Sequence, residues 1–183
     1  MALKGNIPTN SNFLQGAQFL LGFTRLPYMN YFCTAVNFPG VAVNNATQPT
    51  PFVDAPVPGD KLIYEPLTVK FLIDEQLLSY TTILDWIKGY AKPENFDQYK
   101  NLSLQQRLQI SSAATGQPQY SDAILTLYSN KNNPTLQLKF TQMFPTQLSS
   151  IDLATAMSAE EAISCTATFK FTNYTVNRFN QAL

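Results

Sequence analysis

Alternating hydrophobic and polar positions run through much of this chain and predict β-strands. Short apolar or alternating runs cover residues 19–25, 31–38, 62–73, 120–128, 136–140 and 163–176. The turn cluster at residues 129–134 lies between two of these runs and predicts a hairpin. Pro66 has no N–H for a ladder and predicts a bend or bulge at Glu65–Pro66. The pattern indicates a mainly β protein with antiparallel sheets.

One segment, residues 79–90, has the periodicity of a helix. Apolar side chains recur there at spacings of three and four, at Tyr80, Ile83, Leu84 and Ile87. Ser79 is the predicted N-cap, and Pro93 ends the segment. Trp86 lies beside the apolar stripe, which favours a packing role over ligand stacking.

Residues 44–61 form a proline-rich arm between two extended segments. The prolines exclude a helix or a central strand, yet the arm carries Phe52 and Val53. Such an arm is expected to pack against something, either a neighbouring subunit or the sheet edge of its own chain. The residues of the arm predicted to contact another subunit are Pro51, Phe52, Val53, Asp54, Pro56, Val57 and Pro58.

The chain divides into three parts by composition. Residues 1–18 are rich in Asn, Gly, Ser and Gln and predict a flexible N-terminal arm, mobile or ordered by a partner. Residues 19–176 are expected to form a single β domain, and residues 177–183 a C-terminal tail. With 183 residues, 45% of them hydrophobic, the chain is long enough for one real core.

Charge is scarce and balanced. Only 13% of residues are charged, against about a quarter in ordinary soluble proteins, and 12 basic residues cancel 12 acidic ones. A neutral surface of this kind can be covered by copies of itself without desolvating many charges. It creates no net field that attracts nucleic acid or an anionic membrane. The alternative is simply an uncharged β protein.

Candidate chemistry is sparse. The sequence has no histidine, which removes the commonest general base and metal ligand. Cys33 and Cys165 stand far apart and are predicted to be buried free thiols rather than a disulfide. Asp74 and Glu75 follow a predicted strand, where they are turn residues or, alternatively, contact residues for a neighbouring subunit. No catalytic, metal or cofactor site is predicted, and an enzyme is the weakest hypothesis.

The longest apolar run, Phe19–Phe23, is far too short to span a bilayer. The first residues lack the features of a signal peptide, so we expect no membrane association and a cytosolic site of synthesis.

The predicted strand at residues 163–176 is rich in threonine and carries little charge. Apart from Lys170, the strand has little protection against promiscuous pairing. This lack of protection favours an edge strand that pairs with a neighbouring subunit. Phe169, Lys170 and Phe171 are therefore predicted contact residues. An ordinary internal strand is the alternative.

Several short motifs together resemble the tail tube proteins of contractile-tailed, T4-like bacteriophages. They are Phe38-Pro39-Gly40-Val41, Thr50-Pro51-Phe52-Val53-Asp54, Val57-Pro58-Gly59-Asp60-Lys61-Leu62, Phe71-Leu72-Ile73-Asp74-Glu75, Asp85-Trp86-Ile87-Lys88-Gly89, Tyr120-Ser121-Asp122-Ala123 and Phe144-Pro145-Thr146. The resemblance implies an antiparallel β-sandwich or small barrel with one flanking helix. Subunits of this fold form hexameric rings whose inner sheets join into a barrel, and the rings stack.

The resemblance also implies a function. It predicts a structural virion protein, a tail tube subunit whose stacked rings form the DNA conduit inside a contractile sheath, assembled in the host cytoplasm. Its implied partners are its own copies, tail sheath and baseplate proteins, and the tape measure protein and DNA in the lumen, bound without sequence specificity. A baseplate or neck ring that initiates or terminates the tube is one alternative. A monomeric ligand-binding β-sandwich is the second.

Overall fold

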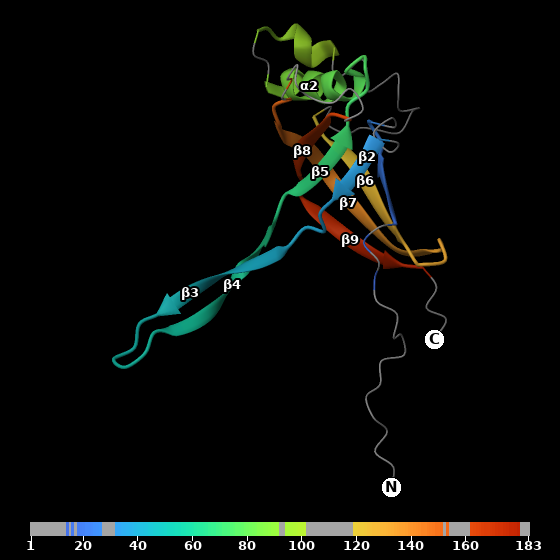
Figure 1. The fold of residues 1–183 in the computed structure, drawn as a ribbon. Helices are drawn as coiled ribbons and strands as arrows, with labels where there is room; N and C mark the ends of the chain where they lie inside the picture. Colours follow the sequence, from blue (N-terminus) through green and yellow to red (C-terminus); the bar gives the residue numbers. More distant parts are fainter. Residues whose placement is uncertain are drawn as a thin grey trace.

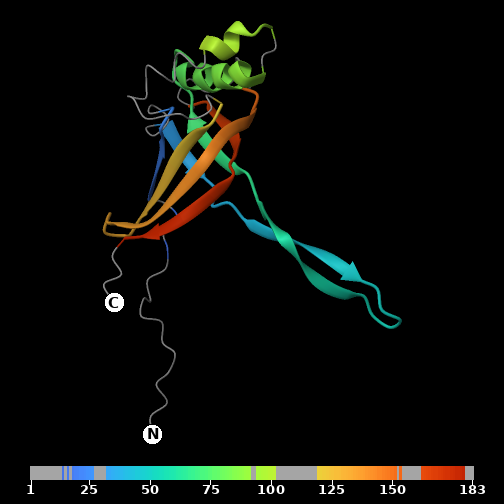
Figure 2. The same ribbon diagram turned by 180° about the vertical axis from the view of Figure 1, so that it is seen from behind.

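The computed structural model describes residues 14, 16, 18–26, 32–91, 94–101, 119–151, 153 and 162–179. They form a β body with helix α2 over one end, and a long hairpin that projects away from the body and the helix (Figures 1 and 2). The elements are β1 (Phe19–Phe23), β2 (Cys33–Val36), β3 (Val41–Gln48), β4 (Ala55–Tyr64), β5 (Leu67–Leu72), α2 (Leu78–Ala91), β6 (Ser121–Tyr128), β7 (Pro134–Leu148), β8 (Ser164–Lys170) and β9 (Asn173–Arg178). The predicted fold class, mainly antiparallel β with one main helix and a long arm, is confirmed.

The body is organised around β7. The strand order is β1-β6-β7-β8-β5-β2, and β9 also pairs with β7. The first part of β7 pairs with β6 and β9, and its last part, from Phe144 onward, pairs with β8. At the change of partners Gln142 adopts a φ of 54°, and its N–H donates to the Asp122 carboxylate at 3.2 Å. This bulge bends β7, so that one strand belongs to both halves of the body.

The core is built from alternate positions of these strands, as the hydrophobic alternation predicts. Its fully buried large side chains include Leu67, Val69 and Phe71 of β5, Leu125 of β6, Leu138 and Phe140 of β7, Phe169 of β8, and Ile83 and Trp86 of α2. Burying each such side chain stabilises the fold by about 1.5–3 kcal/mol relative to exposure.

Helix α2 occupies the span that the periodicity predicts. Trp86 is buried against Phe169, with ring centroids 6.3 Å apart, and its Nε1–H donates to the Gln119 carbonyl at 3.0 Å. The packing role of Trp86 is thereby confirmed. The predicted N-cap is wrong. Ser79 lies inside the helix, and the Asp74 carboxylate accepts the N–H groups of Leu78 and Ser79 at 3.1 and 3.2 Å.

The proline-rich segment is neither a helix nor a central strand, as predicted. β3 and β4 form an antiparallel hairpin of two edge strands that includes these residues, and we call this hairpin the arm. The break predicted at Glu65–Pro66 is confirmed, since β4 ends at Tyr64 and β5 begins at Leu67. Across this break the ladder continues through Glu65 N–H to Gly40 O at 2.9 Å and Asn37 N–H to Thr68 O at 3.2 Å.

The remaining predictions concern the ends and the cysteines. Apart from residues 14, 16 and 18, the proposed N-terminal arm lies outside the described residues, as do residues 180–183 of the proposed tail. β9 continues to Arg178, past the expected domain end at residue 176.

Cys33 and Cys165 are free thiols, as predicted, although only Cys165 is fully buried. Each lies opposite Phe71, on strands that flank β5 from its two sides.

Candidate assembly interface

The arm is a twisted hairpin divided into two halves. Its register shifts after Val43, so the half near the body and the half near the tip pair separately. At this shift Gly59 lies so close to the carbonyl oxygen of Asn44 that a Cβ would collide with it. Only glycine fits this backbone approach without displacing the partner strand.

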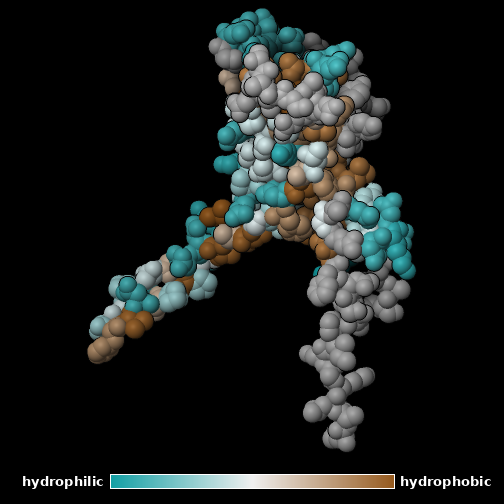
Figure 3. Space-filling view, viewed as in Figure 1, coloured by the Kyte–Doolittle hydropathy of each residue, from teal (hydrophilic) through white to brown (hydrophobic). Residues whose placement is uncertain are grey.

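Apolar side chains lie on both faces of the arm. Val43 lies opposite Leu62 on one face, and Ala42 lies opposite Ile63 on the other. The exposed large apolar residues of the arm are Val41, Val43, Phe52, Val53, Val57, Leu62 and Ile63. Figure 3 shows hydrophobic patches near the base of the arm and at its tip. An isolated two-stranded ribbon is marginally stable in water, and clustered apolar exposure is typical of an interaction surface.

The tip of the arm carries the most exposed of these side chains. Phe52 is 97% and Val53 69% exposed. The Thr50 hydroxyl donates to the Val53 carbonyl and accepts the Val53 N–H at 3.2 Å, which closes the turn locally. Phe52 therefore stands in solvent on an ordered turn, as an anchor for a partner would.

An aromatic cluster anchors the base of the arm. Tyr64 lies 5.4 Å from Phe171 and 5.3 Å from Tyr174, measured between ring centroids. Its hydroxyl donates to Asn173 Oδ1 at 2.7 Å. Phe38, which precedes β3, packs edge-on against Tyr174 at 6.2 Å. The end of β4 and the segment that precedes β3 thus both contact the start of β9, which holds the base of the arm against the body.

Several strands have an unpaired edge within the described part of the chain. β1 and β2 end the strand order of the body, β9 pairs only with β7, and β3 and β4 pair only with each other. The edges of β2 and β3 belong to a long neutral stretch, because residues 26–53 contain no charged residue. Free edges without charges are templates for pairing with another chain.

The structure separates the predicted contact residues into three groups, of which the first lies on the arm. Pro51, Phe52, Val53 and Asp54 form the exposed tip, and Pro56, Val57 and Pro58 lie on β4 and are also exposed. These residues lie together on one projecting element.

The second group, at residues 169–171, does not form the predicted edge. Residues 163–176 are two strands, and β8 is internal, paired with both β5 and β7. Phe169 is fully buried in its own subunit, so its prediction as a contact residue is wrong. Phe171 packs on Phe140 at 5.0 Å, and Lys170 is exposed. The unpaired edge belongs to β9, two residues further on.

Asp74 has a structural task inside the subunit. Desolvation acts to raise the pKa of its carboxyl, but the N–H groups donated by Ser79 and Leu78 outweigh this effect and lower the pKa. The carboxylate thereby satisfies two of the free N–H groups at the start of α2. Glu75 is exposed in the adjacent turn.

Sequence reasoning missed the half of the arm near the body. Val41, Val43, Leu62 and Ile63 are exposed there, but their alternation resembles that of ordinary half-buried strands. It also missed Tyr64 and Asn173, which lie 109 positions apart in the chain. One available signal was the absence of charge from residues 26–53.

One charged side chain of the body, that of Arg25, packs into the core. Arg25 is buried, and its guanidinium lies 5.0 Å from the centre of the Trp86 ring. Burial lowers the pKa of Arg25 to about 10, which leaves it protonated at neutral pH. This cation–π contact joins the segment that follows β1 to α2 and stabilises the core.

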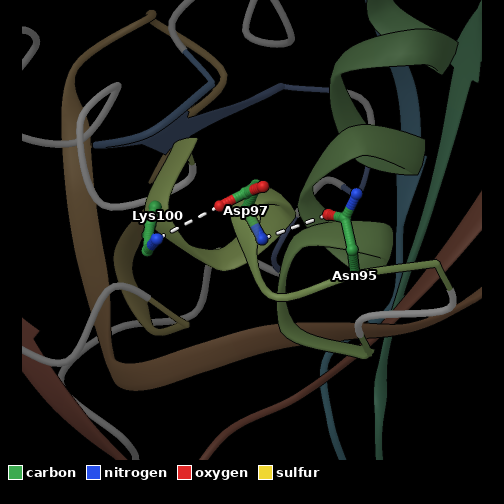
Figure 4. A network of polar contacts seen from close by, with 3 residues as sticks. All are labelled: Asn95, Asp97 and Lys100. Carbon is green, nitrogen blue, oxygen red and sulfur yellow. Dashed lines mark hydrogen bonds and ion pairs between the residues drawn. The ribbon is translucent and has the colours of Figure 1, made fainter.

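A small polar network lies beyond α2 (Figure 4). Asn95 Oδ1 accepts the Asp97 N–H at 3.1 Å and so caps a helical turn at residues 97–101. Lys100 Nζ lies 3.1 Å from Asp97 Oδ1, and both side chains are at least 70% exposed. Such an exposed ion pair contributes about 0–1 kcal/mol to the stability of the fold.

Among the residues described, no group of three or more Cys, Asp or Glu is placed to hold a metal ion, and no helix is long and apolar enough to cross a membrane.

A β body with a projecting apolar arm and unpaired strand edges defines an assembly protein. The chain belongs to the phage tail tube protein family, whose model matches residues 6–177. It is a structural component of a phage tail and not an enzyme.

A curated relative and two solved structures are similar to the chain. It is 28% identical, over 153 residues, to the tail tube terminator protein of Enterobacteria phage T4, covering 79% of this chain and 76% of that protein. A chain of the PVC sheath–tube complex, from an extracellular contractile injection system, has a TM-score of 0.60 at 10% identity and covers 92% and 94% of the two chains. The tube-terminating cap of the anti-feeding prophage has a TM-score of 0.59 at 12% identity and covers 98% and 100%. These two structures share the fold.

Proposed function

We propose that this chain is a ring-forming tube-fold subunit that ends a phage tail tube. The observation that supports this role is its 28% identity to the T4 tail tube terminator over most of both chains. The exposed apolar arm and the unpaired strand edges supply the surfaces that a ring needs.

In this proposal six copies form a ring in the host cytoplasm, and the ring adds to the end of the tube. DNA and the tape measure protein occupy its bore without sequence-specific contacts, in keeping with a formal net charge of zero. The outer surface contacts sheath proteins.

A repeating tube subunit is the second candidate, because the fold is also that of a chain in a sheath–tube complex, with a TM-score of 0.60. The same architecture at the baseplate end of the tube is a variant of the proposed role.

Negative-stain electron microscopy with mass photometry separates these roles. A terminator forms discrete rings that do not elongate and that bind one end of preformed tail tubes. A repeating subunit polymerises into long tubes on its own. A protein that stays monomeric, alone and in the presence of tubes, contradicts both roles and favours the ligand-binding β-sandwich.

Two exposed phenylalanines provide a matched test of the arm. Phe52 is at the tip of the arm, and Phe96, which is 75% exposed, lies beyond α2. We expect Phe52→Asp to abolish ring formation and Phe96→Asp to preserve it, with both variants folded by circular dichroism. Rings of normal yield from Phe52→Asp contradict a role for the tip in ring formation.

A further inference from the structure

We propose that the arm pairs with a second copy of this chain along the outer edge of β3, not along that of β4, and that its acceptor is the open edge of β9 in that copy. The inference rests on the proposed ring-forming function and names the strands that join the subunits.

The prolines of β4 show which edge of the arm can donate hydrogen bonds. Pro58 lies opposite Asn45, and Pro56 lies opposite Thr47. In an antiparallel ladder, alternate pairs point their N–H groups inward, and the other pairs point them outward. A proline fits a ladder only where its nitrogen points outward, because it has no N–H. Pro56 and Pro58 therefore leave the outer edge of β4 without donors at two successive outward positions.

The same pairing gives the outer edge of β3 its donors. Asn45 is paired with Pro58, and Thr47 is paired with Pro56. In pairs of this kind the N–H groups of both residues point out of the ladder, so those of Asn45 and Thr47 point away from β4. All eight residues of β3 are exposed, and the structure pairs this edge with no strand in the described part of the chain. The arm therefore presents one edge that can extend a sheet and one that resists extension.

Charge shows the same asymmetry. β4 carries two charged residues, Asp60 and Lys61, in addition to its two prolines, and charged residues and prolines commonly protect edges in natural sheets. β3 has the sequence VAVNNATQ, with neither a charge nor a proline. Since unprotected edges of this length invite pairing, the β3 edge is expected to be covered in the assembled protein.

β9 fits as the acceptor because its second edge, on the side away from β7, is unpaired in the described part of the chain, near the place where the arm leaves the body. Beyond the contact between Tyr64 and Asn173 the arm diverges from β9, and in the described part of the chain β9 pairs only with β7. Figures 1 and 2 show that the arm and β9 extend in different directions. The arm of a neighbouring copy can occupy the edge that the chain's own arm leaves open.

The residue types on the two edges are compatible. β9 has the sequence NYTVNR, so amide and hydroxyl side chains alternate with Tyr174 and Val176. β3 likewise combines small apolar side chains with asparagine, threonine and glutamine. Pairing β3 with β9 brings no like charges together, because Arg178 is the only charged residue on either strand.

Proline substitution tests which edge is used. Thr47→Pro removes an outward N–H from β3, and Pro56→Ala restores an outward N–H to β4 in the opposite position. We expect Thr47→Pro to reduce ring formation at least about tenfold, and Pro56→Ala to leave it unchanged. Circular dichroism and thermal melting of the monomer check that each variant is folded. Normal ring yield from Thr47→Pro overturns the inference while leaving the ring function intact.

Cysteine cross-linking gives a readout that does not depend on loss of assembly. Ala46 of β3 and Val57 of β4 lie opposite each other on one face of the arm. Each is changed to cysteine and combined in turn with Thr175→Cys, Val176→Cys or Asn177→Cys on β9, which covers the possible registers.

Oxidation of preassembled rings is expected to give covalent multimers with Ala46→Cys and at least one β9 position, and none with Val57→Cys. The reverse pattern assigns pairing to β4 and overturns the inference. Rings without cross-links at any pair overturn β9 as the acceptor. A wild-type protein that forms no rings overturns the proposed function, and this inference with it.

Discussion

Replacing Tyr64 tests whether the aromatic cluster defines the direction of the arm. Its ring contacts Phe171 and Tyr174 at 5.4 and 5.3 Å, and its hydroxyl donates to Asn173 at 2.7 Å. Aromatic pairs contribute about 0.5–1.5 kcal/mol each, and a hydrogen bond about as much. We expect Tyr64→Phe to lower the free energy of unfolding by about 1 kcal/mol, and Tyr64→Ala by about 2–4 kcal/mol.

Two measurements separate a local effect from a global one. Urea denaturation gives the free energy of unfolding, and hydrogen–deuterium exchange of residues 41–64 reports how the arm is held. A double-mutant cycle of Tyr64→Phe and Asn173→Ala isolates the hydrogen bond. Additive losses in the cycle, together with unchanged arm exchange in Tyr64→Ala, refute the idea that this contact orients the arm.

Three further predictions concern the interior of the subunit. Phe169→Ala should cost about 3–5 kcal/mol in chemical denaturation, because the side chain is fully buried, whereas a contact residue would affect only assembly. Asp74→Ala should lower the melting temperature, with Asp74→Asn as the control that keeps an N-cap oxygen. Because the pKa of Asp74 is lowered in the folded state, its stabilising effect should be present above about pH 4 and disappear as the pH falls through the folded pKa, so melting curves of wild type and Asp74→Ala should converge in acid. Gly59→Ala should disrupt pairing in the arm and raise its hydrogen–deuterium exchange, and unchanged exchange contradicts the steric argument.

Local signals in the sequence were sufficient for the helix and most of the strands. The stripe of Tyr80, Ile83, Leu84 and Ile87 predicted α2 to within one residue at each end. The N-cap was misassigned because Ser79 has the right residue type, whereas Asp74 reaches the same N–H groups from four and five residues away. Residue type alone does not show which side-chain oxygen accepts the free N–H groups at the start of the helix.

The arm and the edge strand were harder because both depend on neighbours in space. Proline normally argues against a strand, but in a two-stranded hairpin every strand is an edge, so Pro56 and Pro58 are tolerated on β4. The alternation over residues 163–176 continues through the break between β8 and β9. Periodicity therefore could not show that Phe169 lies in an internal strand or that β9 has the open edge.

The sharing of β7 between the two halves of the body has a mechanical consequence. A pull on the arm reaches β2 and β5 through the backbone, and β5 passes the load to β8 across its ladder. It also reaches β9 through the hydrogen bond between Tyr64 and Asn173, and β9 is paired with β7. From β7 the load divides between β6 and β8, so neither half can yield alone. A subunit connected in this way should unfold under force in one cooperative step, with a single peak in its force–extension curve.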